Sequence, residues 1–362
     1  MGLVFALDKN SAHPPLELLF TVDEETGLVG ATELKSGFID GKILLNLDSE
    51  DEGIFTVGCA GGKHTFVDLQ LKYTDAPKKY NPCSIKAGGM KGGHSGVDIK
   101  EERANAIIIL TRVLSLIEDD IRIVYINGGT AHNAIPRDAE AVIFVSEDRE
   151  KAVKKVVKDF EKTVKIEFAN TEPDLKLNLS SFKDIKDDRA MTTETTKKVI
   201  DLILAMPHGV IGMSTDIEGL VETSNNLANV KVEDGMLKVL SSQRSSVMSK
   251  LFEISGKIES IAKLAGAVYE TSKGYPAWQP NMDSPLLDKC KKLYKKMNKK
   301  DSVIEIIHAG LECGIIGSKY PGMDMISFGP TIKNPHSPDE MINVETIGMV
   351  WDFFAELLKS LK

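Results

Sequence analysis

Residues 16–50 read LELLFTVDEETGLVGATELKSGFIDGKILLNLDSE, and this stretch decides the fold. It holds two short apolar runs, Leu16–Val22 and Ile43–Leu47, and acidic residues follow each of them at once. Short, nearly continuous apolar runs predict strands that are buried on both faces of a parallel sheet. Because ligands bind outside the carboxyl ends of such strands, we expect these acids to meet at one edge of an α/β sheet.

The acids form two groups, Asp23-Glu24-Glu25 and Asp48 in NLDSEDEG. Carboxylates gathered at one edge repel one another unless a cation lies among them. A water-activating metal enzyme also needs a second carboxylate beside the metal to take a proton. The pattern therefore predicts a metal site with one glutamate left as a base. Each group alone is also typical of a solvated acidic turn or a cap.

Four further residues lie in loops that favour a functional role. His336 lies in KNPHSPDE, where the flanking prolines would hold its ring rigidly, as a metal ligand requires. With the two acidic groups, it matches the ligand set of a hydrolytic dizinc centre. The others are His94 in GGHSG, Asn133 in AHNAIPR, and Arg244 in SSQRSSV, which could grip a substrate carboxylate. From spacing alone, such residues are more often structural or exposed.

Composition excludes several classes of protein. The 362 residues favour two domains, and the net charge of −8 argues against a nucleic-acid partner. The longest apolar runs are too short to cross a membrane, so we expect no membrane partner. Without a recognisable leader, a cytoplasmic location is the expectation. The four cysteines show no CxxC spacing and are expected to be free thiols.

The order of patterns predicts an insertion in the α/β domain. We expect a catalytic domain made of residues 1–62 and 275–362, and an inserted α+β domain over 63–274 with an antiparallel sheet and helices on one face. Within the insertion, helical spacing predicts a helix over Glu150–Val164, and the next apolar residues predict a strand over Val164–Phe168.

Seven motifs of the chain resemble those of one enzyme family: FTVDEETG, NLDSEDEG, VGCAGG, GGMKGGHSGVDI, NAIPRDAEAV, HAGLECG and FGPTIKNPHSPDE. They are similar to the aminoacyl-histidine dipeptidases, also called Xaa-His or cytosolic non-specific dipeptidases. These belong to the dizinc metallopeptidases that include aminoacylase and carboxypeptidase G. The resemblance covers essentially the whole chain. It implies a phosphorylase/hydrolase-like α/β catalytic domain with an inserted lid.

The resemblance also implies roles in the catalytic domain. Glu24 resembles the general base, and Glu25, Asp48 and His336 resemble metal ligands. Gly310, in HAGLECG, resembles part of a loop that contacts the substrate backbone. The implied cofactor is two Zn²⁺ ions, with Co²⁺ or Mn²⁺ as substitutes.

In the lid, His94 resembles a histidine that stabilises the oxyanion. Asn133 and Arg244 resemble residues that hold the peptide, Arg244 at its terminal carboxylate. The implied partners are a small dipeptide, including those that end in histidine, and a second copy in a homodimer.

One departure from the family pattern concerns the start of the sequence. The family places a His-x-Asp motif and a metal-bridging Asp ahead of the DEE motif, and neither is in these residues. Met1–Leu7 resembles the helix that follows the bridge, so we expect an N-terminally truncated chain that binds metal weakly or at a single site. Two rivals stay open: an inactive remnant that serves as a binding domain, and an N-acyl amino acid hydrolase.

Overall fold

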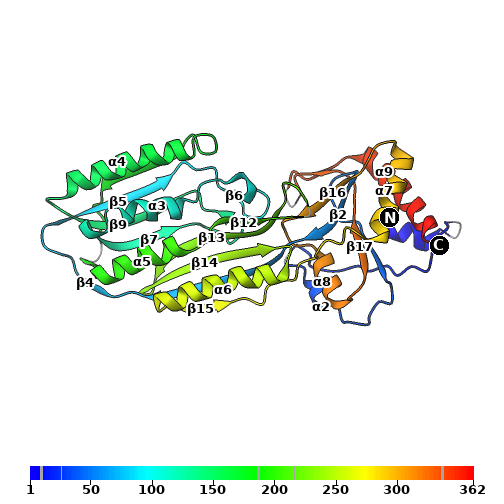
Figure 1. Ribbon diagram of the computed structural model, residues 1–362, viewed down its shortest axis with the longest axis horizontal. Helices are drawn as coiled ribbons and strands as arrows, with labels where there is room; N and C mark the ends of the chain where they lie inside the picture. Colours follow the sequence, from blue (N-terminus) through cyan, green and yellow to red (C-terminus); the bar gives the residue numbers. More distant parts are fainter. Residues whose placement is uncertain (9–10, 26, 186–187, 216, 336–337) are drawn as a thin grey trace. The chain divides into compact units, whose positions relative to one another are not determined.

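The structure is a computed structural model that describes residues 1–8, 11–25, 27–185, 188–215, 217–335 and 338–362. Its contacts divide the chain into two compact units (Figure 1). Unit 1 comprises Met1–Gly61, Ser246–Met248 and Tyr275–Lys362, and unit 2 comprises Gly62–Ser245 and Ser249–Gly274. We describe each unit by itself.

Unit 1 alternates short strands with helices, as its sequence predicts. Its helices are α1 (Gly2–Leu7), α2 (Val29–Glu33), α7 (Pro285–Asn298), α8 (Glu312–Lys319) and α9 (Val344–Ser360). Its strands are β1 (Ile43–Asn46), β2 (Ile54–Cys59), β16 (Val303–Ile307), β17 (Asp324–Ser327), β18 (Ile332–Lys333) and β19 (Met341–Ile342).

The main sheet of unit 1 is mixed rather than parallel. In the described residues it has four strands in the order β1-β17-β2-β16. The pairs β1–β17 and β16–β2 are parallel, whereas β17–β2 is antiparallel. The predicted parallel arrangement is therefore confirmed for β1–β17 and β16–β2 and was wrong for β17–β2. The second apolar run does form β1, as predicted, and its carboxyl end leads to Asp48.

The first apolar run, Leu16–Val22, is not a strand, so that prediction was wrong. The physical reason is that a strand needs hydrogen-bonded neighbours, and β1 instead pairs with β17. The sequence pattern had the right composition for a strand but could not supply a partner for it.

Aromatic packing holds the helices of unit 1 to its sheet. Phe55 of β2 lies with its ring centroid 5.2 Å from that of Phe353 in α9, which also lies 5.2 Å from Phe328. Phe5 of α1 is buried and stacks on Trp351 at 4.7 Å. These contacts fix α9 and α1 beside the sheet.

Unit 2 carries the larger sheet of the two. Its strands are β3 (Gly61–Gln70), β4 (Tyr73–Asp75), β5 (Tyr80–Gly88), β6 (Gly93–His94), β7 (Ile121–Gly128), β8 (Ala134–Ile135), β9 (Ala139–Ser146), β10 (Lys176–Ser181), β11 (Arg189–Met191), β12 (Gly209–Met213), β13 (Val221–Glu233), β14 (Met236–Ser245) and β15 (Val268–Thr271). Its helices are α3 (Ala106–Ser115), α4 (Glu150–Glu167), α5 (Thr193–Ala205) and α6 (Met248–Ala265), with 3-10 turns at Ile99–Glu101 and Glu118–Asp120.

Nine strands of the described residues form the main sheet of unit 2, in the order β10-β5-β9-β7-β13-β14-β3-β15, with β12 beside β13 (Figure 1). Seven of its strand pairs run antiparallel, as predicted: β10–β5, β12–β13, β13–β14, β13–β7, β15–β3, β5–β9 and β7–β9. One continuous apolar core joins the sheet to α3, α4, α5 and α6. Every large apolar side chain of β9 from Val142 to Val145 is buried.

The strand predicted over Val164–Phe168 was wrong, because α4 continues to Glu167. Val164 lies on the same helical face as Val153 and Val157, and all three are buried. Its apolar side chain therefore serves the helix, which a short apolar run alone does not reveal.

Candidate active site

Glu24 and Glu25 lie in a turn that backbone hydrogen bonds close. The carbonyl oxygen of Glu24 accepts the N–H of Gly27 at 3.0 Å and that of Leu28 at 2.8 Å. The turn leads into α2, whose Ala31 is fully buried against α8. Glu24 is half-buried and Glu25 exposed, so the two adjacent carboxylates have different environments.

Asp48 is held at the end of β1 by a chain of polar contacts. Its backbone N–H donates to Oδ1 of Asn46 at 3.1 Å, and the hydroxyl of Ser327 donates to the same oxygen at 2.6 Å. Next to it, Oγ of Ser49 lies 2.8 Å from Oγ of Ser327 and 3.1 Å from Oγ1 of Thr56. The side chain of Asp48 itself is exposed, so the network positions an accessible carboxylate.

The buried thiol of Cys313 in unit 1 lies in the electrostatic reach of Asp48. Burial raises the pKa of the Cys313 thiol well above its usual value, and the neighbouring groups Cys59, Glu312 and Asp48 raise it further. Glu312 and Cys313 begin α8. Cys59 and Cys313 are both buried free thiols, as expected.

In unit 2 the structure gathers three of the predicted residues. His94 and Ala134 are paired across β6 and β8, and the carbonyl oxygen of Asn133 accepts the N–H of Ser95 at 2.7 Å. Arg244, in β14, is only 8% exposed, and its charge lowers the pKa of His94. His94, Asn133 and Arg244 thus contribute to one region of unit 2.

The ring of His94 has a defined tautomer. Its Nδ1 accepts the backbone N–H of Gly96 at 3.3 Å and that of Val97 at 3.2 Å. Burial lowers the pKa of His94, as do the charges of Arg244 and His132, while Asp98 opposes them. A neutral ring that accepts at Nδ1 carries its proton on Nε2, so His94 presents a neutral N–H donor.

Two further histidines of this region were not singled out from the sequence. The rings of His64 and His132 meet edge to face with centroids 5.0 Å apart. Burial lowers the pKa of His64 to about 4, helped by the charges of His132 and Arg244. A signal was present for His132, which precedes Asn133 in the same loop. His64 follows VGCAGG on β3, and no local pattern marks it.

Gly310 lies between β16 and α8, where a side chain has no room. A Cβ atom there would lie 2.8 Å from a ring carbon of Tyr275. Its backbone is therefore packed against an aromatic face, within unit 1.

The comparisons with known proteins decide the family. The family model described as a peptidase dimerisation domain (M20) matches residues 85–172, in unit 2. The chain is 39% identical over 362 residues to the cytosol non-specific dipeptidase of Escherichia coli, covering 99% of this chain and 74% of that protein. The chain belongs to this dipeptidase family. The solved aminoacylhistidine dipeptidase of Vibrio alginolyticus matches with a TM-score of 0.95 and 35% identity, covering 100% of this chain and 74% of that one.

Membership in this metallopeptidase family confirms the mixed α/β fold and implies a divalent metal ion. The described residues hold no group of three or more His, Cys, Asp or Glu side chains that could bind such an ion. Glu25 and Asp48 have suitable carboxylates, and His336 lies outside the described residues. These donors alone do not complete a metal site. In the part of the chain that the structure describes, no helix is long and apolar enough to span a membrane.

Proposed function

We propose that this chain hydrolyses the peptide bond of unblocked dipeptides, including those that end in histidine, with Zn²⁺ as its metal. The names of its dipeptidase relatives support this substrate class, because the similarity extends over nearly the whole chain. Glu25, Asp48 and His336 are the proposed metal ligands, and Co²⁺ or Mn²⁺ are the proposed substitutes.

The observation that carries the proposal is the region around His94 and Arg244. A buried guanidinium can form two hydrogen bonds to a carboxylate, and a free dipeptide has a carboxylate at its C-terminus. A neutral Nε2–H donor suits an oxygen that gains negative charge as the peptide carbonyl is attacked. We therefore assign Arg244 to the terminal carboxylate, His94 to the oxyanion, and Asn133 to the peptide group.

In unit 1 we assign the proton transfer to Glu24. It would take a proton from the attacking water and pass it to the leaving amine. Its half-buried position and its closed turn support that role, because a base must be held still and keep an accessible oxygen. Gly310 is the proposed contact for the substrate backbone.

We also propose a homodimer, a cytoplasmic location, and an inserted domain at residues 63–274. The matched dimerisation-domain model supports the dimer, and the relative from Escherichia coli is named a cytosol enzyme. The division of the contacts near Gly62 and Gly274 supports the domain boundaries.

The test is dipeptide hydrolysis by the purified chain with Zn²⁺, Co²⁺ or Mn²⁺ added. We expect Arg244→Lys to lower kcat/KM by roughly 100-fold for free dipeptides, because about 3 kcal/mol of bidentate binding is lost. It should have little effect on amidated dipeptides. The matched control is Arg112→Lys, which changes a half-buried arginine of α3 paired with Glu167. Equal losses on free and amidated dipeptides would contradict the role of Arg244.

A second pair of variants tests the base. Glu24→Gln should abolish turnover and leave dipeptide binding in place, whereas Glu33→Gln, at an exposed position of α2, should change neither. Turnover of acetylated amino acids in place of dipeptides would favour the N-acyl amino acid hydrolase.

A further inference from the structure

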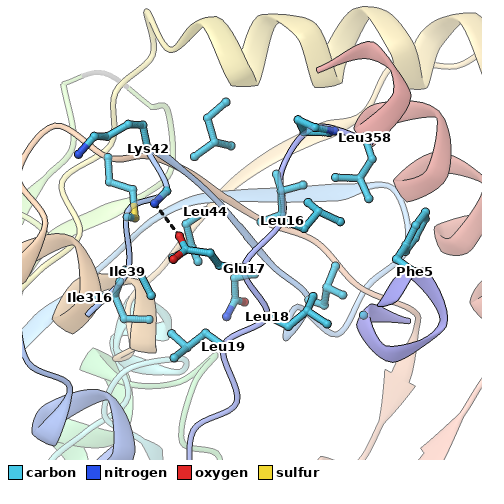
Figure 2. A pocket seen from close by; sticks show the side chains of 18 of the residues that line it. Phe5, Leu16, Glu17, Leu18, Leu19, Ile39, Lys42, Leu44, Ile316 and Leu358 are labelled. Carbon is cyan, nitrogen blue, oxygen red and sulfur yellow. Dashed lines mark hydrogen bonds between the residues drawn. The ribbon is translucent and has the colours of Figure 1, made fainter. Parts of the chain in front are cut away.

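Unit 1 contains an apolar cavity, and unit 2 contains a partly buried polar network. The cavity, of about 520 Å³, lies between the segment 16–21 and strand β1 (Figure 2). There the carboxylate of Glu17 accepts the backbone N–H of Gly41 at 2.7 Å and so holds the loop before β1. Within the described ranges, no residue that we assign to the reaction lines this cavity. The polar network of unit 2, in contrast, leads to His94.

His94 lies in the segment that joins β5 to α3, residues 89–105, which we call the His94 loop. One buried carboxylate ties its two ends together. Glu172, which follows α4, is only 1% exposed. Its Oε2 accepts the backbone N–H of Lys91 at 2.8 Å, and its Oε1 accepts that of Ala104 at 3.2 Å. Because a buried carboxylate is costly unless donors surround it, these bonds fix the two ends of the loop beside each other.

Inside the His94 loop, Arg103 holds two further points of the chain. Its Nη1 donates to the carbonyl oxygen of Gly92 at 2.6 Å, and its Nη2 donates to Oδ1 of Asp98 at 3.1 Å. The side chains of Arg103 and Asp98 are 23% and 28% exposed, so water has limited access to the pair. A planar guanidinium fixes the directions of both acceptors at once, which the single ammonium group of a lysine does not.

Asp98 contacts both backbone groups of His94. Its Oδ2 accepts the N–H of His94 at 2.8 Å, and its own N–H donates to the carbonyl oxygen of His94 at 2.9 Å. The ring is held at a third atom, since Nδ1 accepts the N–H groups of Gly96 and Val97. With its backbone and Nδ1 held in this way, the neutral histidine keeps its ring proton on Nε2.

The glycine before His94 shows how closely these groups pack. A Cβ atom on Gly93 would clash with Nη1 of Arg103 and would lie 2.7 Å from Oδ2 of Asp98. The φ of Gly93 is +138°, which also favours glycine. A side chain at this position would push the pair of Arg103 and Asp98 away from the backbone. The glycine therefore allows the pair to lie directly against the chain that carries His94.

We propose that Asp98 is a positioning residue that, held by Arg103, fixes the backbone and the ring of His94 for the developing oxyanion. The inference rests on the oxyanion role proposed above for His94, and Asp98 acts on the reaction through this histidine. An oxyanion donor is effective when it is in place before the charge develops, because its reorganisation during the reaction costs free energy. The glycines at 92 and 93 give the backbone freedom, and the contacts of Asp98 remove it.

The first test measures the ring of His94 without turnover. Nitrogen NMR of the full chain with labelled histidine rings locates the ring proton, and the signals lost in His94→Gln are those of His94. We expect a single tautomer with the proton on Nε2 in the parent chain, and a mixture of both tautomers in Asp98→Asn. The matched control is Asp120→Asn, which breaks a pair with Arg149 and changes a carboxylate of similar exposure, 25%. It should leave the His94 signals unchanged.

The second test separates kcat from KM for a free dipeptide. Asp98→Asn should lower kcat about tenfold, because it misplaces one oxyanion donor without removing it. The KM should stay within about twofold of the parent value, because Arg244 still binds the terminal carboxylate. Arg103→Lys should lower kcat about threefold, since a lysine cannot hold both acceptors of the guanidinium. Arg149→Lys, the matched control for this variant, should leave kcat and KM unchanged.

A double variant shows whether Asp98 acts through His94. If it does, Asp98→Asn should lower kcat no further once His94→Gln has removed the donor. Additive losses of kcat in the double variant would overturn the inference, as would a His94 ring that keeps a single tautomer in Asp98→Asn. If His94→Gln left kcat unchanged, the oxyanion role of His94 would be wrong, whereas the ring measurement would still decide whether Asp98 positions this histidine.

Discussion

Strand β9 of unit 2 and strand β1 of unit 1 differ in how completely they are buried. The central strand β9 of unit 2 has neighbours on both sides and is buried from Ala141 to Val145. In unit 1, β1 has no buried residue, although three of its four residues are large and apolar. Apolar composition is therefore not enough for burial; a strand also needs neighbours in its sheet and layers above and below it.

The largest expected effect is a core truncation in unit 2. Ile143→Ala should cost about 3 kcal/mol, because Ile143 is fully buried between β5 and β7. The same change at Leu44 of β1 should cost about 1 kcal/mol, since that side chain is half-buried. Denaturant titrations, monitored by the hydrogen exchange of the β9 and β1 amides, measure the loss of unfolding free energy for both variants. Ile166→Ala, at an 80% exposed position, is the neutral control. Equal costs at the two strands would remove the contrast.

Next come two glycines whose backbone touches another segment. A Cβ on Gly129 of unit 2 would lie 2.0 Å from the oxygen of Ala228, and φ there is +78°. A Cβ on Gly329 of unit 1 would lie 1.7 Å from the oxygen of Ser49. Gly129→Ala should destabilise unit 2 by about 3 kcal/mol.

Gly329→Ala should act locally instead. It should shift the loop that holds Asp48 and speed amide exchange at Ser49. The control is Gly256→Ala in α6, which has open space and should stabilise by about 0.5 kcal/mol. If Gly329→Ala instead lowered the unfolding free energy of all of unit 1, the effect would not be local, and the sheet of unit 1 would unfold as cooperatively as that of unit 2.

A smaller effect concerns acid stability of unit 2. Nδ1 of His208 accepts the N–H of Leu227 and lies 3.3 Å from the side-chain nitrogen of Asn105, and burial lowers the pKa of His208 to about 4. Below pH 6.5 the unfolded chain takes up a proton that the folded ring does not, so stability falls as pH drops toward 4.

Between pH 7 and 4.5 this histidine should account for a loss of about 2 kcal/mol in the free energy of unfolding. His208→Gln should flatten that slope, which denaturant titrations at several pH values will measure. Part of the slope should persist, because His64 also has a pKa of about 4. An unchanged slope in the variant would exclude His208 as the source.

The smallest effect is expected at the surface of unit 2. Lys231 and Lys238 hydrogen-bond to Glu233 and lower its pKa to about 2. Because this group is solvated, Glu233→Gln should leave the thermal midpoint unchanged, and added salt should make no difference. A clear shift of the thermal midpoint would contradict this prediction, because it would show that the ion pairs of Glu233 stabilise unit 2.

The sequence by itself determined most elements of the fold, because hydrophobic periodicity and caps are local. It predicted β1 and most of α4 near their observed places, and its motifs indicated the family that the comparisons confirmed. The site residues stay predictions, although the sequence named His94, Asn133 and Arg244, which the structure gathers in unit 2.

Only the tertiary structure decided which of these segments pair with another strand. Leu16–Val22 has the composition of a strand, yet no neighbour in the described residues pairs with it, because a strand's hydrogen bonds come from distant segments. The nearness of His64 to Arg244 and the edge-to-face contact of His64 with His132 likewise depend on residues far apart in the chain. Local sequence patterns do not predict such contacts, because they reflect only residues that are close together in the chain.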